Sequence, residues 1–403
     1  MMDRKWIRPD MNLYHIGENK EHIITIANSG ILEVDFYKYA QSFYKAAEIV
    51  IHYLGEEAAE NHDIAKLDLW YFATVYLYRQ SLELLLKANI FQIVTDVGNR
   101  RAIVGKIRHD LKQSFEKLIE IKKLSIDENE NAKWVMDYLA DISRIDKESD
   151  MFRYPFGSNL KALFDKQTNI SLVATHDNMN KAYKFVKEIY DTGAFSTQNY
   201  KAYSPQLIIE GGFFYQQSVV GYNYPRHSFF PYFSSYSEVG NFLKKKILKQ
   251  KQFDLFIPMC YLYRNAVELG LKRLIIEDSH MDNSQRIKIL RSKRHSIRGL
   301  WNSIADEISE YVNVPDDDTT LKDTQRYIQT FHDFDQSSYL FRYPCDKKMK
   351  PFFLNAKKFD IDNVASCFEE LCNFMYSVDG MLSSIKEYEA EMAAEMASYY
   401  DYN

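Results

Sequence analysis

The sequence predicts an all-α protein built from two similar helical halves. The stretch 76–87 returns as 261–272 with its aromatic and charged positions kept. In each copy the apolar residues recur every three or four positions, which is typical of an amphipathic helix with one buried face. Further marks follow in the same order at nearly the same offset, so we interpret the chain as an internal duplication. Glycine and proline are scarce, which fits long helices joined by short loops.

Length, net charge, cysteine spacing and the lack of long apolar runs limit the classes to which the protein can belong. A length of 403 residues suggests two to three domains, and a net charge of -5 does not indicate a nucleic-acid binder as a whole. The four cysteines form no CxxC pair, so we expect reduced thiols rather than a disulfide framework. The chain has no apolar run of about 18 residues, and its first ten residues lack the apolar core of a secretory signal. We therefore expect a cytoplasmic protein without membrane association.

In the first half, a short strand is expected at 23–27 before the Asn28-Ser29-Gly30 turn. The apolar periodicity then predicts helices at 34–53, 65–94, from Leu111 onward, at 132–142 and at 177–190. The long helix over 65–94 contains the repeated stretch, and basic residues connect it to the next helix. Gly193 suits the end of the last helix.

The polar stretch 193–206 is the expected linker, and 207–209 would echo the early strand. Helices are then predicted over 229–246, 266–276, 323–332 and 361–382, followed by a helical extension. The resulting organisation is one bundle over 1–195 and a second over 207–403. Short strands are allowed for near the start of each half.

Three charged marks recur in both halves. Arg79, Glu83 and Lys87 are spaced four apart and form one stripe of a helix. Their counterparts in the second half are Arg264, Glu268 and Lys272. A histidine follows a basic run in each half, at His109 and His295, and each half later contains Phe-Arg-Tyr-Pro, at 152–155 and 341–344.

The order of these marks resembles bacterial HEPN-like domains. The marks are Glu-x-x-x-Lys on one helix, His-(Asp/Ser)-(Leu/Ile) at the start of the next, and then Asp-x-x-Ser-x-x-Phe-Arg-Tyr-Pro. The resemblance implies two tandem bundles of mostly antiparallel helices covering nearly the whole chain. It also implies either a ribonuclease of a defence or toxin-type system or a non-catalytic RNA-binding or scaffold protein. Catalysis would be metal-independent, and no cofactor is expected.

Catalytic members of that superfamily carry Arg, four to six residues, and then His. Arg326 and His332 fit this spacing, as do Arg8 and His15, which lie outside the expected bundle. The position corresponding to His332 in the first half is Ser143, so the pair is not duplicated. Whether the protein is an enzyme is therefore left open. His109 and His295 are further catalytic candidates, with helix capping or a semi-buried structural role as the alternative.

The duplicated arginines Arg153 and Arg342 have two interpretations. In the first, Glu83–Arg153 and Glu268–Arg342 are buried ion pairs that hold a loop against the bundle. In the second, the His and Arg of each half converge on an RNA phosphodiester. The basic runs are candidates for RNA binding, with a solvated loop as the alternative. Their members are Arg100, Arg101, Lys106, Arg108, Arg291, Lys293 and Arg294.

The sequence contains no P-loop, dinucleotide fingerprint, metal-ligand cluster or nucleophile elbow. This argues against ATPases, dehydrogenases and serine hydrolases, and no metal is expected. The expected partners are RNA or a protein of the same system. HEPN-like domains usually pair, so we expect the two halves to form an intramolecular pseudo-dimer, with further homodimerisation left open. The sequence does not specify an RNA target or an activating trigger.

Overall fold

The computed structural model describes residues 5–401 except 157–163, 165, 222–227, 313–314, 316 and 337. Over this range the chain is mainly helical, which confirms the expected all-α class. The outermost residues of the two expected bundles, 1–4 and 402–403, lie outside the described residues. None of the helices described here has both the length and the apolar character that crossing a bilayer requires.

The first part of the chain supplies two strands and seven helices among the described residues. These elements are β1 (Ile23–Ile26), α1 (Leu32–Tyr53), α2 (Ile64–Leu69), α3 (Tyr71–Ile93), α4 (Val97–Ile107), α5 (Leu111–Lys122), α6 (Glu130–Ile145), β2 (Thr168–Ser171) and α7 (Leu172–Thr192). The long helix expected over 65–94 is interrupted at Trp70, which separates α2 from α3. The basic connection is itself helical, because Asp96 caps α4 by accepting a hydrogen bond from the amide of Asn99.

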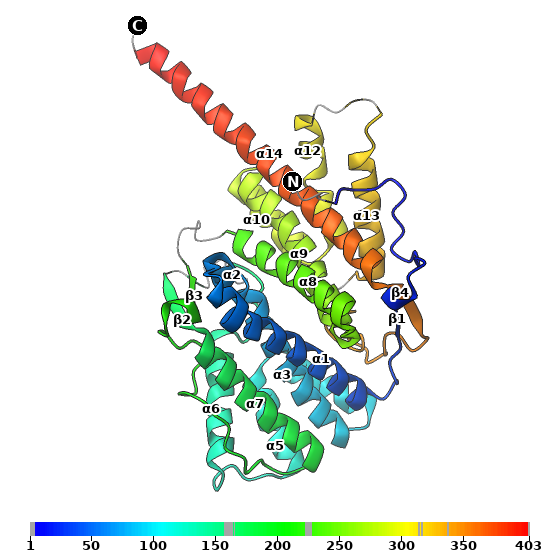
Figure 1. Cartoon of the computed structure of the whole chain (residues 1–403), viewed down its shortest axis with the longest axis vertical. Helices are drawn as coiled ribbons and strands as arrows, with labels where there is room; N and C mark the ends of the chain where they lie inside the picture. The colour runs from blue at the N-terminus through cyan, green and yellow to red at the C-terminus, as the bar shows by residue number, and fades with distance from the viewer. Residues whose placement is uncertain are drawn as a thin grey trace.

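The second part of the chain continues in a similar order. Its elements are β3 (Gln217–Val220), α8 (Phe230–Gln250), α9 (Phe256–Arg273), α10 (Asn283–Lys293), α11 (Ile297–Trp301), α12 (Ala305–Tyr311), α13 (Thr320–Phe334), β4 (Lys357–Asp360) and α14 (Ile361–Asp401). Residues 207–209 do not form a strand of their own, and the first strand of this part is β3. The closing helix and the expected extension are one helix, α14, whose end projects from the body (Figure 1).

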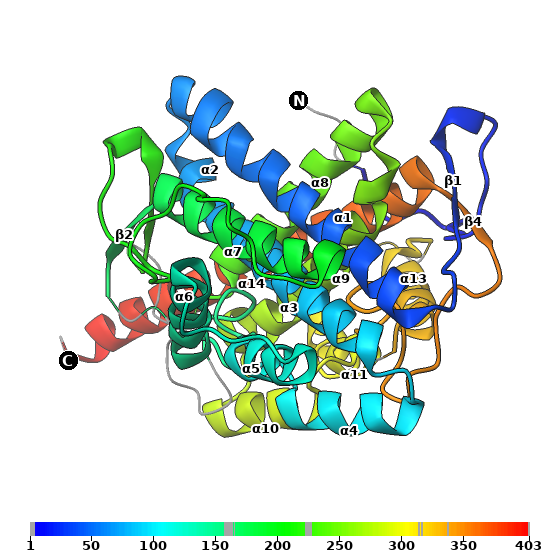
Figure 2. The same ribbon diagram turned by 90° about the horizontal axis from the view of Figure 1, so that it is seen from below.

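The core is organised around α3 and α9. Every residue of α3 from Tyr71 to Phe91 is buried, and so is every residue of α9 from Phe256 to Lys272. α1, α5 and α7 pack on α3, whereas α8 and α14 pack on α9 (Figures 1 and 2). A helix buried on all sides must satisfy any charge that it carries within the protein. The charged stripe on each of these two helices is therefore internal.

Both small sheets join distant parts of the chain. β1 pairs antiparallel with β4, with Ile23 opposite Asp360, and β2 pairs antiparallel with β3, with Thr168 opposite Val220. The N-terminal segment also contacts α14, where Arg8 Nε lies 2.8 Å from Glu370 Oε1. The expected division into bundles over 1–195 and 207–403 stays a prediction, because these contacts cross it.

Candidate functional site

The candidate site is built around Glu83, a glutamate of α3 with no solvent exposure. Its Oε2 lies 3.0 Å from Arg79 Nη1, and its Oε1 lies 2.6 Å from Lys87 Nζ. Residues four apart share one face of a helix, so both cations reach the same carboxylate. A buried carboxylate needs such partners to offset its lost hydration. The repeated Arg-Glu-Lys stripe is thus a buried ionic cluster rather than a surface ladder.

His109 is held against this carboxylate by the start of α5. Asp110 is the N-cap of that helix and accepts a hydrogen bond from the amide of Gln113 at 3.0 Å. Arg79 Nη2 donates to the carbonyl oxygen of His109 at 2.7 Å. In this position His109 Nδ1 lies 3.1 Å from Glu83 Oε1. The His-(Asp/Ser) mark therefore combines a positioned histidine with the cap of the following helix.

The last partner of Glu83 comes from the distant segment before β4. The hydroxyl of Tyr343 donates to Glu83 Oε1 at 2.6 Å, and it lies 3.3 Å from His109 Nδ1. The expected Glu83–Arg153 ion pair is wrong. Arg153 is buried, but its Nη2 pairs with Asp150 at 2.8 Å and its Nε donates to the carbonyl of Ser149. In the Phe-Arg-Tyr-Pro motif, the tyrosine rather than the arginine reaches the glutamate.

A matching cluster surrounds Glu268 on α9. Its carboxylate lies 3.0 Å from Arg264 Nη1, 2.7 Å from Lys272 Nζ and 2.9 Å from His295 Nδ1. The hydroxyl of Tyr154 donates to Glu268 Oε1 at 2.8 Å. Tyr154 belongs to the first Phe-Arg-Tyr-Pro motif, so the two motifs exchange tyrosines between the two glutamates.

The expected Glu268–Arg342 pair is wrong for the same reason. Arg342 is buried, and its Nη2 donates to the hydroxyl of the neighbouring Tyr343 at 3.3 Å. Gln80 of α3 donates to the carbonyl of Arg342 at 2.9 Å. Near this point the rings of Tyr76 and Tyr261 stack with centroids 4.9 Å apart. The arginines thus belong to the region where α3 and α9 meet.

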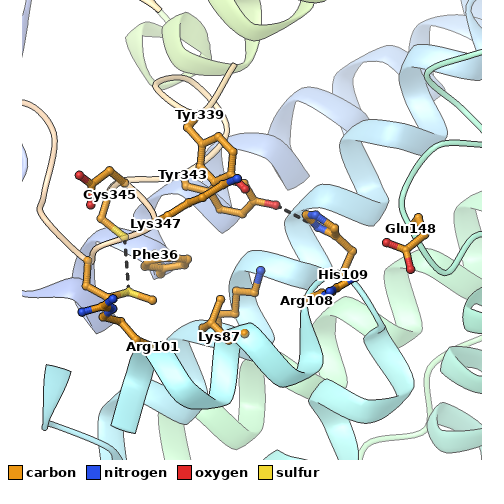
Figure 3. Close-up of a pocket in the computed structure, with 14 residues that line it drawn as sticks. Phe36, Lys87, Arg101, Arg108, His109, Glu148, Tyr339, Tyr343, Cys345 and Lys347 are labelled. Carbon is orange, nitrogen blue, oxygen red and sulfur yellow. Dashed lines mark hydrogen bonds between the residues drawn. The ribbon is translucent and has the colours of Figure 1, made fainter. Parts of the chain in front are cut away.

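A pocket of 440 Å³ opens beside the Glu83 cluster. Figure 3 shows His109 and Tyr343 on its wall, with basic side chains from both parts of the chain around it. Arg101 lies on α4, Arg108 follows that helix, and Lys347 lies in the segment after Phe-Arg-Tyr-Pro. The remaining lining residues are Phe36, Lys87, Val104, Gly105, Glu148, Tyr339, Cys345, Asp346 and Met349. The cluster is therefore completed by side chains from both parts and borders a space large enough for a ligand.

The surroundings set the charge of the central groups. Burial alone would raise the pKa of Glu83, but the charge of Lys87, the hydrogen bond from His109 and the charge of Arg79 outweigh it and hold the pKa well below its usual range. Burial also lowers the pKa of His109, against the opposing effect of Glu83. At neutral pH the pair is then an ionised carboxylate beside a neutral imidazole. A neutral His109 that donates from Nδ1 to Glu83 presents its Nε2 as a proton acceptor.

Comparison with known proteins identifies no relative of this chain. No protein-family model, curated protein or solved structure matches this chain. Any functional conclusion must therefore come from the geometry of the two clusters and the pocket.

The pair expected from the Arg-x(4–6)-His spacing is placed elsewhere, on α13. Arg326 donates to the carbonyl of Pro9 and lies 3.1 Å from Asp323 Oδ1. His332 is buried, and its Nδ1 has no hydrogen-bond partner among the described residues. Neither residue lines the pocket beside Glu83. Arg326 is occupied by its contacts with Pro9 and Asp323, and its catalytic role with His332 stays a prediction.

The basic residues expected to bind RNA separate into two groups. Arg100 is buried, where its Nη2 pairs with Glu33 at 2.9 Å and donates to the carbonyl of Phe91. That guanidinium stabilises the end of α3 and is not presented to a ligand. The other six candidates are exposed, and Arg101 and Arg108 among them line the pocket. These six are Arg101, Lys106, Arg108, Arg291, Lys293 and Arg294.

Two kinds of site residue were missed at the level of sequence. Tyr154 and Tyr343 lie inside the recognised motif, but the motif does not reveal which glutamate each reaches. Asp146, the first residue of the same motif, lies 2.9 Å from Arg79 Nε through its Oδ2, and its Oδ1 accepts hydrogen bonds from the amides of Asp150 and Met151. A repeated acid preceding a repeated arginine was a usable signal for this contact.

A second group of ligand-type side chains lies outside the pocket. Glu48, His52 and His176 bring their carboxylate and imidazole atoms within 4.8 Å of one another. The sequence alone indicates no metal-ligand cluster here, because His176 is remote from the other two along the chain. The detectable signal was the spacing of Glu48 and His52, which are four apart on one helix.

Proposed function

We propose that this chain is a tandem HEPN-like protein that binds and cleaves RNA at the pocket beside Glu83. The observation that carries the proposal is His109, whose Nδ1 faces an ionised buried glutamate while its ring borders a pocket with basic walls. A histidine oriented by a carboxylate is a common general base. The exposed cations Arg101 and Arg108 supply sites for phosphate groups.

The proposed reaction is transfer of a phosphodiester to the neighbouring ribose hydroxyl. His109 Nε2 takes the proton of the 2′-hydroxyl, and the resulting oxygen attacks the adjacent phosphorus. The bond from phosphorus to the 5′ oxygen breaks, and that oxygen leaves with a proton supplied by water. The products are a 2′,3′-cyclic phosphate and a 5′-hydroxyl end. Arg101 and Arg108, which are exposed and line the pocket, would stabilise the negative charge that grows on the phosphoryl oxygens.

The same proposal treats the two halves as copies that pair within one chain. Four contacts of Glu83 recur at Glu268 with the same atoms and similar distances. The exchanged tyrosines, Tyr154 and Tyr343, are what a pseudo-dimer of two bundles would use to complete both clusters. Such a protein would act in a defence or toxin-type system, which is the setting that the HEPN-like resemblance implies.

A second candidate function is a non-catalytic helical scaffold for a partner protein. It is favoured by the complete internal pairing of Glu83, which leaves Arg79 and Lys87 fully engaged in the structure. Buried clusters of this kind can serve only to fix the relation between elements. The two candidates make opposite predictions for His109, because a scaffold does not need its imidazole to exchange protons.

The deciding experiment incubates the full chain with a labelled single-stranded RNA in the presence of EDTA. We expect cleavage to cyclic-phosphate ends by the wild type and a rate about 10²–10⁴-fold lower for His109→Ala, the range typical of a missing general base. His62→Ala is the matched control, because His62 lies outside the pocket. Binding is measured in parallel over a range of salt concentrations.

Arg101→Ala and Arg108→Ala should weaken RNA binding and reduce the salt slope by about 0.7 for each phosphate that is no longer neutralised. Both side chains are exposed, so the fold should be retained. Intact RNA at all enzyme concentrations, together with wild-type binding by both arginine variants, would reject the RNA proposal. Binding without cleavage, unchanged in His109→Ala, would leave an RNA-binding scaffold.

A further inference from the structure

Three metal-ligand side chains meet on the outer face formed by α1 and α7, helices that lie side by side in both views (Figures 1 and 2). Glu48 and His52 are one turn apart on α1, and His176 is on the first turns of α7. His176 Nε2 lies 3.5 Å from Glu48 Oε1, and His52 Nε2 lies 3.9 Å from Glu48 Oε2. All three ligand atoms lie within 4.8 Å of one another.

These separations suit a small tetrahedral cation. Zinc binds nitrogen and oxygen ligands at about 2.0–2.2 Å, so the ligand atoms of a tetrahedral site lie about 3.3–3.5 Å apart. The 3.5 Å between His176 Nε2 and Glu48 Oε1 falls within this range. The 3.9 Å between His52 Nε2 and Glu48 Oε2 exceeds it by about 0.4–0.6 Å. His52 is the most exposed of the three, with 57% of its side chain accessible, so its ring has room to adjust.

The residues behind the ligands orient them for this role. Asp177 Oδ1 lies 2.9 Å from His176 Nδ1, which leaves Nε2 as the nitrogen directed at Glu48. The hydroxyl of Tyr78 donates to Glu48 Oε1. Carboxylate and hydroxyl partners of this kind are typical of the groups that surround metal ligands and fix their orientation. Asp177 is in turn paired with Lys201 at 2.8 Å.

An open coordination position is also present. A cavity of 180 Å³ is lined by His52 and His176 and extends to Glu56 and Gln216. A site with three protein ligands leaves a fourth position for water, as in catalytic zinc centres. We propose that Glu48, His52 and His176 form a binding site for a divalent transition-metal ion of the zinc type, with its fourth ligand supplied from this cavity.

The equivalent place on the other key helix shows that the fold does not require this group. Tyr263 corresponds to Tyr78, and its hydroxyl donates to Asn241 Oδ1 at 2.6 Å, where Tyr78 meets Glu48. One turn beyond Asn241 the residue is Lys245, in place of His52. An amide and a lysine cannot provide this ligand set. Of these two equivalent places, only the α1–α7 face carries the three ligands.

The test is a titration of the full, untagged chain with Zn²⁺ after EDTA treatment and dialysis, followed by calorimetry. Co²⁺ is titrated separately, because its visible absorption reports four-coordinate binding. We expect one Zn²⁺ per chain and a rise in melting temperature on binding. His52→Ala and Glu48→Gln should weaken binding by more than the roughly 10–100-fold that removal of a supporting residue costs. Glu48→Gln retains an acceptor for Tyr78, and His52 is exposed, so neither change should unfold α1.

The matched control is His280→Ala. His280 also lies between two carboxylates, with Nδ1 3.0 Å from Glu307 and Nε2 2.9 Å from Glu389. Among the described residues, however, these three side chains do not bring their ligand atoms within 4.8 Å of one another. Its removal should leave Zn²⁺ affinity unchanged. The proposal is overturned if the folded wild type binds no Zn²⁺, or if His52→Ala and Glu48→Gln bind it as tightly as the wild type. Loss of the bound ion in His280→Ala would place the metal elsewhere and would overturn it equally.

Discussion

Replacing Glu83 by glutamine tests whether the buried cluster stabilises the fold. The carboxylate has no exposure and is surrounded by Arg79 at 3.0 Å, Lys87 at 2.6 Å and His109 at 3.1 Å, with the hydroxyl of Tyr343 at 2.6 Å. A glutamine keeps one acceptor but turns the other oxygen into a donor that faces cationic donors. Buried Lys87 then loses its counter-charge and Arg79 keeps only Asp146, which costs about 3–5 kcal/mol of unfolding free energy.

The measurement is urea unfolding followed by circular dichroism, with calorimetry as a second probe. Glu130→Gln is the matched control, because its side chain is 87% exposed and its ion pair is with Lys133 on the surface of the same helix. The control should unfold like the wild type. If Glu83→Gln unfolds within about 0.5 kcal/mol of the wild type, the range of ordinary surface changes, then the cluster does not stabilise the protein and the reasoning fails.

The pH dependence of the stability that Glu83 contributes tests its assigned charge state. The folded pKa of Glu83 lies well below its usual value, so its contribution is fully present above the unfolded pKa of about 4.3. That contribution is lost as the pH falls through the folded pKa. The stability difference between wild type and Glu83→Gln should therefore shrink in acid. A difference that grows toward low pH would contradict the assigned charge state.

The same contacts lead to three further expectations. Arg153→Ala should lower the unfolding free energy by about 1.5–3 kcal/mol, less than a broken Glu83 pair would cost, because Arg153 bonds the partly exposed Asp150; calorimetry measures this. His109 should titrate by NMR below its usual pKa of about 6.5, so its contribution to stability is present above that pH and falls as His109 is protonated in acid. Proteolytic cleavage within 193–206 should leave two fragments that elute together on size exclusion, because both sheets and both tyrosine contacts join them. Fragments that separate without denaturant would contradict that prediction.

Much of the helical framework was predictable because apolar periodicity reports burial directly. The long helices α1 and α14 begin close to where the pattern predicts them, and the strand β1 appears where β-branched residues precede a turn. The break at Trp70 was not predictable, since the apolar pattern continues through it. α4 was missed because it is short and strongly basic, although its cap Asp96 was a local signal.

The sequence places part of the buried cluster together, but it does not specify the contacts from remote segments. Arg79, Glu83 and Lys87 share a helix face, so their spacing alone places them together. His109 and Tyr343 reach the same carboxylate from remote parts of the chain, and no local rule specifies such a contact. The incorrect Glu83–Arg153 pairing arose from assigning each motif to its own half. It also assumed that the charged residue of Phe-Arg-Tyr-Pro must be the partner of the acid.

The exchange of tyrosines has a physical rationale in the burial of the two glutamates. Within its own part of the chain, each carboxylate already meets an arginine, a lysine and a histidine, and a further cation would add to an existing excess of positive charge. A tyrosine hydroxyl adds a hydrogen bond to Oε1 without adding charge. Because Tyr154 and Tyr343 each come from the opposite part, neither cluster is complete until α3 and α9 have docked. The pocket beside His109 is walled partly by the segment that carries Tyr343. Its shape and charge therefore depend on that docking.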